Sequence, residues 1–285
     1  MTVFCLGSIN VDHVYRVPHL PGPGETLAAT EVTTGLGGKG ANQSVAAARA
    51  GARVVHIGAV GPDGDRMVAA LAAYGVDIDH IVRVEDPTGH AIITVEARGE
   101  NAIVLFPGAN CRQSVARIAE VLAAAGPEDT LLLQNETSHQ VEAARIGREK
   151  GARVIYSAAP FDVDAVRAVL PHVSLLAMNA VEAEQLQAAL GTLAGTEKIV
   201  TQGAKGAWWH FGGRALHAPA FRVDPVDTTG AGDCFIGAVA AALDEQADRA
   251  CALRFASAAA ALKVTRAGAG DAMPARAEIE ALLNV

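Results

Sequence analysis

Short runs of apolar, often β-branched residues alternate with alanine-rich stretches along most of this chain. The runs have the length of buried strands, and the stretches have the length and spacing of helices. The clearest runs are TVFCLG (2–7), ARVVHIGAV (52–60), TLLLQN (130–135) and ARVIYSA (152–158), and the clearest helical stretches are ANQSVAAARA (41–50), GDRMVAALAAYG (64–75) and HQVEAARIGREKG (139–151). Strands that alternate with helices form βαβ units, so the pattern predicts an α/β fold with a central, mostly parallel sheet flanked by helices.

Two regions depart from this alternation. Residues 11–34 and 88–107 carry strand-like segments with no helical stretch between them, and the segment Arg98-Gly99-Glu100-Asn101 predicts a hairpin turn. We expect these regions to form a small antiparallel β lid beside the main sheet. An exposed apolar face on such a lid would favour a homodimer. No low-complexity linker divides the sequence, so residues 1–285 are predicted to be a single domain with this lid.

Charge and composition narrow the classes of function. Of the residues, 51% are apolar, and the formal net charge of −8 argues against a broad basic surface for nucleic acid. No stretch reaches the roughly 18 apolar residues that a membrane span needs, and no basic region precedes the short apolar run at the N-terminus. The four cysteines are scattered without a CxxC pair, which disfavours a zinc site or a disulfide framework. We therefore expect a soluble cytoplasmic protein without a nucleic-acid or membrane partner.

The segment DTTGAGDCF (227–235) points to chemistry on phosphate. Gly230, Ala231 and Gly232 leave room for backbone N–H groups to face an anion where a helix begins. Asp233 follows on the first turn, where its carboxylate can accept a proton from an alcohol that attacks the phosphate. A kinase needs this pair of features, whereas the alternative is that Asp233 only caps its helix.

The glycine-rich segment GLGGKGANQ (35–43) precedes a predicted helix. Gly35, Gly37 and Gly40 match a literal G-x-G-x-x-G, which is a weak dinucleotide fingerprint. It is not a P-loop, because Gly40 follows Lys39 where that motif has Ser or Thr. Lys39 and Asn42 flank glycines that expose backbone donors, an arrangement suited to a hydroxyl-rich ligand. A structural turn into the helix is the alternative interpretation.

Polar side chains also follow several predicted strands. Asn10 and Asp12 come after VFCLG, Glu136 follows LLLQN, and Asn179 and Glu182 follow SLLAM. The carboxyl ends of parallel strands meet at one edge of a sheet, where α/β proteins bind ligands. Each residue by itself is explained by a turn or a helix cap. Taken together they predict one site, in which Asp12 could accept hydrogen bonds from neighbouring hydroxyls of a sugar.

Six segments in this order resemble the ribokinase-like (PfkB-type) carbohydrate kinase family over nearly the whole chain: GSINVDH, PGPGET, GGKGANQ, MNAVEAE, TQGAKG and DTTGAGD. GSINVDH and GGKGANQ are most similar to the ribokinase group of that family. The resemblance implies an ATP-dependent kinase that transfers the γ-phosphate to a primary hydroxyl of a sugar, with D-ribose as the first candidate and ribose 5-phosphate as the product. Another furanose, a ketohexose or a nucleoside is the alternative acceptor.

The resemblance also implies roles for individual residues. Asp233 would be the catalytic base, with Gly230, Ala231 and Gly232 as the anion hole. The sugar would be held by Asn10, Asp12, Gly38, Lys39, Gly40, Asn42 and Glu136. The nucleotide would lie along Asn179, Thr201, Gly203, Lys205, Gly206 and Gly232, with Ser257 near the adenine. Mg²⁺ would be held through water by Asn179 and Glu182. A monovalent cation, K⁺ in relatives, would be bound by the side chain of Asp227 and by carbonyls of Thr229, Lys263, Arg266 and Gly268.

Three positions depart from the family pattern. Ala272 stands where the family offers a hydroxyl to the monovalent cation, which leaves K⁺ dependence open, and Asp271 adds a charge beside it. The segment between Glu184 and Val200 is too short for a second helix before the next strand, which predicts a more open nucleotide side.

Two other classes of function fit the sequence less well than a kinase does. A dinucleotide-dependent oxidoreductase would need an acidic residue at the end of the strand after the glycine-rich segment, where none occurs before Asp63. It would also leave DTTGAGD unexplained. A sugar sensor without activity on the same fold is disfavoured by the intact Asp233.

Overall fold

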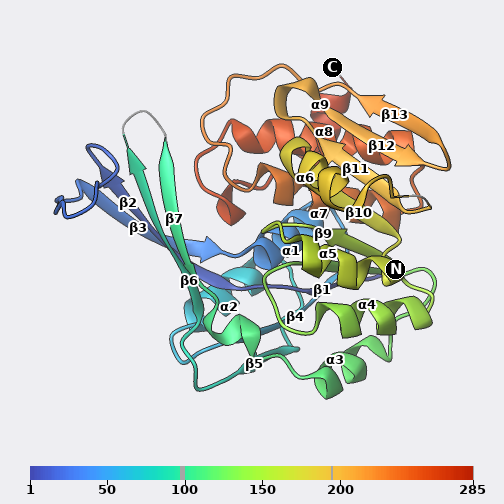
Figure 1. The fold of residues 1–285 in the computed structure, drawn as a ribbon, viewed down its shortest axis with the longest axis horizontal. Coiled ribbons are helices and arrows are strands. Elements are labelled where there is room, and N and C mark those ends of the chain that lie inside the picture. The colour runs from blue at the N-terminus through green and yellow to red at the C-terminus, as the bar shows by residue number, and fades with distance from the viewer. Residues whose placement is uncertain (97–99, 194, 285) are drawn as a thin grey trace.

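A nine-stranded sheet forms the centre of the molecule (Figure 1). The computed structural model describes residues 1–96, 100–193 and 195–284. The strand order is β13 (Arg214–Ala218), β12 (Ala207–Phe211), β11 (Glu197–Thr201), β10 (Leu175–Asn179), β9 (Arg153–Ser157), β8 (Thr130–Gln134), β1 (Val3–Leu6), β4 (Val54–Val60) and β5 (Ile81–Arg83). All pairs from β5 to β11 are parallel, and β12 and β13 add an antiparallel hairpin at one edge. The mostly parallel sheet predicted from the sequence is therefore confirmed.

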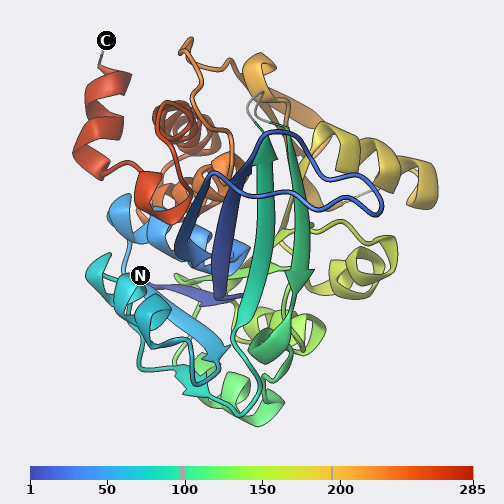
Figure 2. The same ribbon diagram turned by 90° about the vertical axis from the view of Figure 1, so that its left-hand side faces the viewer.

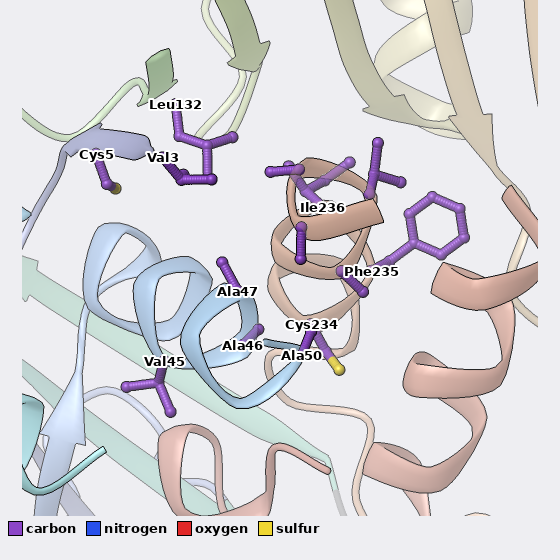
Figure 3. Packing of buried hydrophobic residues seen from close by; sticks show 14 of the residues in the cluster. Val3, Cys5, Val45, Ala46, Ala47, Ala50, Leu132, Cys234, Phe235 and Ile236 are labelled. Atoms are coloured by element: carbon purple, nitrogen blue, oxygen red, sulfur yellow. The ribbon is translucent and has the colours of Figure 1, made fainter. Parts of the chain in front are cut away.

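Helices cover both faces of this sheet. One face carries α1 (Lys39–Arg49), α2 (Asp65–Ala73), α7 (Ala231–Asp244), α8 (Arg249–Val264) and α9 (Arg276–Leu283), and the other carries α3 (Val115–Leu122), α4 (Gln140–Glu149), α5 (Val163–Val169) and α6 (Ala180–Leu190). Successive side chains of a strand point to opposite faces. Val3 and Cys5 of β1 accordingly pack toward α1 and α7 (Figure 3), whereas Phe4 and Leu6 pack into the opposite core. Apolar runs, rather than alternating ones, are what a sheet buried on both faces requires.

The order of the strands reverses at β1. The chain leaves β1 and builds β4 and β5 on one side, and it later places β8 and the following strands on the other side. In open α/β sheets, ligands bind outside the carboxyl ends of the strands at such a switch point. The ends of β1 and β8 therefore mark the place to look for a site.

A second, four-stranded sheet projects from the body as the predicted lid (Figure 2). Its order is β3 (Glu31–Gly37), β2 (Asn10–Val17), β6 (Gly89–Glu96) and β7 (Asn101–Phe106). The outer pairs are antiparallel, as expected, but β2 and β6 run parallel, so the lid is a mixed sheet. The sequence could not reveal this parallel pairing, because β2 and β6 are far apart along the chain, with β3, α1, β4, α2 and β5 between them. Arg98 and Gly99 of the predicted turn lie outside the described residues.

The connection from α6 to β11 is short, as predicted. Residues 191–193, 195 and 196 form no helix in the structure. Among the described residues, no helix combines the length and the apolar character that crossing a membrane demands.

Candidate active site

The N-terminus of α1 rests directly on the turn that follows β1. A Cβ atom added to Gly40 would lie 2.3 Å from the Cα atom of Gly7, so only glycine allows this approach. Gly38 precedes the helix with φ of 93°, a conformation that glycine adopts without strain. The Gly40 N–H donates to the Ser8 hydroxyl at 3.2 Å. Gly38 and Gly40 thus allow α1 to begin in direct contact with the turn after β1.

The same segment excludes the dinucleotide interpretation. Gly35 and Gly37 lie in β3 of the lid rather than in a turn between a strand and a helix of the main sheet. A Cβ atom at Gly37 would lie 2.0 Å from the Asp12 carboxylate. Gly37 therefore makes room for a side chain of the candidate site, and the oxidoreductase alternative loses its fingerprint.

Glu136 completes the start of α1 from a distant part of the sequence. Its Oε2 atom accepts hydrogen bonds from the Lys39 N–H at 3.0 Å and from the Ser8 hydroxyl at 2.5 Å. Gly38 has no side chain with which to cap the helix, so Glu136 takes that role. The end of β8 is thereby tied to the end of β1, which brings together two of the strand ends singled out in the sequence.

Asp233 lies on the first turn of α7, and both of its carboxylate oxygens face α1. Oδ2 accepts from Nδ2 of Asn42 at 3.2 Å, and Oδ1 accepts from Nε2 of Gln43 at 3.0 Å. The Gln43 amide is itself oriented by Gln134, whose Nε2 donates to Gln43 Oε1 at 2.8 Å. Burial raises the pKa of the Asp233 carboxyl, while Lys39 and the two amides oppose that rise. A raised pKa suits a group that must accept a proton.

Lys39 is the counter-ion that the site shares. Burial lowers the pKa of its ammonium, but the carboxylates of Asp233, Glu136, Glu182 and Asp12 together raise that pKa above its ordinary value. Burial, with Glu136 and Asp233 nearby, raises the pKa of Asp12 to about 6, against the effect of Lys39. The carboxylates that act on the Lys39 ammonium thus come from β2 (Asp12), the turn after β8 (Glu136), α6 (Glu182) and α7 (Asp233).

Two connected pockets open beside Asp233. The smaller, of about 200 Å³, is lined by Lys39, Asn179, Glu182, Gly230 and Asp233 among others. The larger, of about 490 Å³, includes Thr201, Gly203, Gly206, Gly232 and Ser257 in its wall. The two share Thr201, Thr228, Ala231 and Gly232, at the start of α7. Lys205 lies in the turn 203–205 but is not among the lining residues, and the Ser257 hydroxyl donates to the Leu253 carbonyl.

The start of α7 has free amide donors. Gly230 adopts φ of 70° before the helix, and a Cβ atom on Gly232 would meet nothing within 4 Å. The Ala231 N–H donates to the Thr228 carbonyl at 3.1 Å. The N–H groups of Gly230 and Gly232 have no backbone acceptor within the described residues, so they are the donors that a phosphate could use.

Asn179 and Glu182 form a reciprocal cap at the start of α6. The Glu182 N–H donates to Asn179 Oδ1, and the Asn179 N–H donates to Glu182 Oε2 at 2.8 Å. This cap fixes the Glu182 carboxylate in the wall of the smaller pocket. One fixed carboxylate beside a phosphate site is a donor set that fits Mg²⁺, which retains most of its water.

Several contributing residues carried no signal in the sequence. Asn110 is buried, donates from Nδ2 to Asn10 Oδ1 at 2.8 Å and accepts the Ile9 N–H at 2.9 Å. Gln43 ends the segment GLGGKGANQ and Gln134 ends a buried strand, and neither position reveals a hydrogen-bond partner distant in the sequence. Asn42 Oδ1 is buried and has no hydrogen-bond partner among the described residues, which leaves an acceptor ready for a ligand hydroxyl.

The residues proposed for a monovalent cation are linked by hydrogen bonds, and a buried ammonium lies beside them. Asp227 accepts from the Thr229 N–H at 2.8 Å and from the Gly268 N–H at 2.9 Å, one on each carboxylate oxygen. The carbonyl of Asp227 accepts from the ammonium of Lys263 at 2.9 Å. Ala272 is buried and offers no oxygen from its side chain, and the Arg266 guanidinium pairs with Glu278. The Lys263 ammonium therefore lies beside the residues that the family resemblance assigns to the cation.

The fold and site together define a class of protein. A buried carboxylate at a helix start, free amide donors beside it, and a pocket that continues into a larger one are the parts of a phosphoryl-transfer enzyme with an alcohol acceptor. The family comparison agrees, because the model of the "pfkB family carbohydrate kinase" matches residues 2–276. The chain belongs to the pfkB family of carbohydrate kinases.

Individual relatives agree with this assignment. The chain is 39% identical to the ribokinase of Haemophilus influenzae, over 97% of this chain and 96% of that one. The crystal structure of ribokinase from Thermotoga maritima superposes with a TM-score of 0.87 and 34% identity, covering 100% of this chain and 99% of that chain. The structure of Arabidopsis thaliana ribokinase complexed with ribose and ATP superposes with a TM-score of 0.86 and 29% identity, covering 100% and 98%.

The hydrogen-bonded chain from Gln134 through Gln43 to Asp233 leads to a prediction about pH. Gln43→Leu removes one donor to the carboxylate, so the pKa of Asp233 rises and the acid limb of the kcat/KM profile moves to higher pH. At neutral pH, kcat/KM should fall by about tenfold, the equivalent of one hydrogen bond to a charged group. Pre-steady-state or steady-state rates across the pH range measure both effects.

Gln134→Leu provides the matched test, because Gln134 does not touch Asp233. It should shift the acid limb in the same direction, and the double variant should resemble Gln43→Leu alone, since the two residues act in series. If the losses of kcat/KM in the two single variants simply added in the double variant, the hydrogen-bonded series from Gln134 through Gln43 to Asp233 would be contradicted.

Proposed function

We propose that this enzyme transfers the γ-phosphoryl group of ATP to the primary hydroxyl of D-ribose and forms ribose 5-phosphate. The observation that carries the proposal is the meeting of two helix N-termini at Asp233. The first turn of α1 supplies Lys39, Asn42 and Gln43, and the first turn of α7 supplies Asp233 and the free N–H groups. A sugar hydroxyl and a phosphate could therefore face each other across this carboxylate.

The sugar would lie beneath the lid. Asp12 enters the site from β2, Asn10 is held in place by Asn110, and Asn42 keeps a free buried acceptor. These groups are oxygen-rich and fixed by hydrogen bonds, which suits several neighbouring hydroxyls of one small ligand. Closure of the lid over them would exclude water and limit hydrolysis of ATP.

The nucleotide would occupy the larger pocket, with its phosphates at the start of α7. The shared residues between the two pockets give the γ-phosphate a path to Asp233. Asp233 would take the proton of the attacking hydroxyl, and a weak base suffices because the transition state is loose. We include Mg²⁺ as the partner of ATP, held through water by Asn179 and Glu182, where it would neutralise charge on the phosphates. A cytoplasmic location stays a prediction, supported by the four free thiols.

A panel of acceptors tests the proposal directly. Ribose, 2-deoxyribose, fructose and adenosine are each incubated with ATP and Mg²⁺, and ADP release is measured, with the product identified by phosphorus NMR. Ribose should give the highest kcat/KM and a 5-phosphate.

Asp233→Asn keeps the shape of the side chain but not its basicity, so kcat should fall by about 10²- to 10⁴-fold while ATP binding by calorimetry persists. A preference for the nucleoside, or near-normal turnover in Asp233→Asn, would refute the assignment of acceptor or base respectively.

We also propose that the lid forms a homodimer. Every residue of β7 is exposed although Ile103 to Phe106 are apolar, and Val104 is 70% exposed. The register places Val104 opposite Ile92 and Asp12 opposite Ala91, so Val104 and Ile92 lie on the face away from Asp12. An exposed apolar face next to an unpaired strand edge favours a second copy of the same sheet.

Val104→Asp should weaken this dimer by at least about tenfold, because it would bury an unpaired charge at a cost above about 1.4 kcal/mol. Sedimentation equilibrium measures the change. Val181→Asp on α6, where Val181 is 62% exposed, is the control and should leave the association unchanged. A wild-type protein that stays monomeric, or equal effects of both substitutions, would argue against the lid as the interface.

A further inference from the structure

Lys263 is a buried cation that the proposed mechanism does not use. It lies in the last turn of α8 and is 0% exposed, and its ammonium donates to the Asp227 carbonyl at 2.9 Å. Burying an ammonium is costly unless hydrogen bonds and negative groups compensate for the lost water. The groups around Lys263 must therefore offset the cost of burying its ammonium.

The surroundings of Lys263 connect it to the anion hole. Asp227 begins the segment that leads into α7, and both its N–H and that of Val226 donate to the Val264 carbonyl. Burial lowers the pKa of Lys263, while the nearby Asp227, Cys234 and Asp233 counteract that lowering. Lys263 in turn opposes the rise in the pKa of Asp233. Its positive charge is therefore felt at the first turn of α7, where the phosphate would bind.

The segment after α8 is held by contacts within the protein. The Gly268 N–H donates to Asp227 Oδ2 at 2.9 Å, Arg266 pairs with Glu278, and the Tyr74 hydroxyl donates to Asp271. The Lys263 carbonyl already accepts the Arg266 N–H at 3.0 Å. The two segments that the family resemblance assigns to a monovalent cation are thus joined by hydrogen bonds, with an ammonium between them and no hydroxyl at Ala272.

We propose that the ammonium of Lys263 takes the place of the monovalent cation, so that the enzyme needs no K⁺. Lys263 acts as a positioning residue that does not touch the substrate: it holds the Asp227 segment in place and supplies fixed positive charge behind the anion hole. An added K⁺ would lie close to this ammonium, whose hydrogen bond to the Asp227 carbonyl holds it beside the proposed ligands, and repulsion between the two positive charges disfavours K⁺ binding. The inference rests on the proposed phosphoryl transfer at Asp233, but it does not depend on which sugar is the acceptor.

The first experiment uses the wild-type protein in choline, sodium and potassium chloride at equal ionic strength. We expect the same kcat in all three salts and no rise of Tm with K⁺ concentration. Activation by K⁺, or a saturable rise of Tm that is specific to K⁺, would overturn the proposal. Failure to phosphorylate any sugar in every salt would count against the proposed function, whereas the melting temperatures still test the cation site by themselves.

Two variants of Lys263 separate charge from volume. Lys263→Ala removes the charge and opens space, so kcat in choline chloride should fall by at least about tenfold, and K⁺ or ammonium should restore part of it and raise Tm. Lys263→Met removes the charge but fills the space, so it should lose activity to a similar extent without restoration by either cation. The proposal would be overturned if Lys263→Met kept the wild-type kcat, or if K⁺ or ammonium restored both variants alike or neither of them. The Tm of each variant in choline chloride verifies that it is folded.

Discussion

The close approach of α1 to the turn after β1 is the constraint on which the rest of the structure depends. Because Gly7 and Gly40 have no side chains there, the helix start reaches the carboxyl ends of β1 and β8. Its first turn then carries Lys39, Asn42 and Gln43 to the first turn of α7, where Asp233 lies. The packing of α1 against α7 continues along both helices through small residues such as Ala46 and Gly237 (Figure 3). This position is what qualifies Asp233 for the proposed role of base.

Charge balance is the second feature that the site requires. Four carboxylates are held near one another, which would be unfavourable without the ammonium of Lys39 among them. A second ammonium, that of Lys263, lies behind the same helix start and makes its contact with the backbone of Asp227. Each of these two cations belongs to the protein, so the fold fixes their positive charge at the site. Phosphoryl transfer depends on such prearranged charge.

The sequence predicted the fold class, which the structure confirms, because that class follows from local patterns; the roles of the site residues rest on motifs and on the family resemblance and stay predictions. Apolar runs predicted the parallel sheet, and polar residues at strand ends predicted one edge of it. Local patterns carry no signal for partners distant in the sequence, so the Glu136 cap on α1, the Gln134 contact to Gln43 and the Asn110 contact to Asn10 were not foreseen. The parallel pairing of β2 with β6 was missed for the same reason. No role was predicted for the Lys263 side chain, because the family resemblance assigns only the Lys263 carbonyl, as a ligand of the monovalent cation.

The most direct test of this account measures the ionisation of Asp233 itself. Carbon-13 NMR of the labelled Asp233 carboxyl gives its titration midpoint in the wild type and in Lys39→Met, which keeps the length of the side chain but not its charge. We expect a higher midpoint in Lys39→Met, because Lys39 is the strongest of the groups that oppose the effect of burial on the Asp233 pKa. An equal or lower midpoint would show that Lys39 does not control the ionisation of Asp233, and it would contradict the inference that the junction of α1 with α7 sets the charge of this carboxylate.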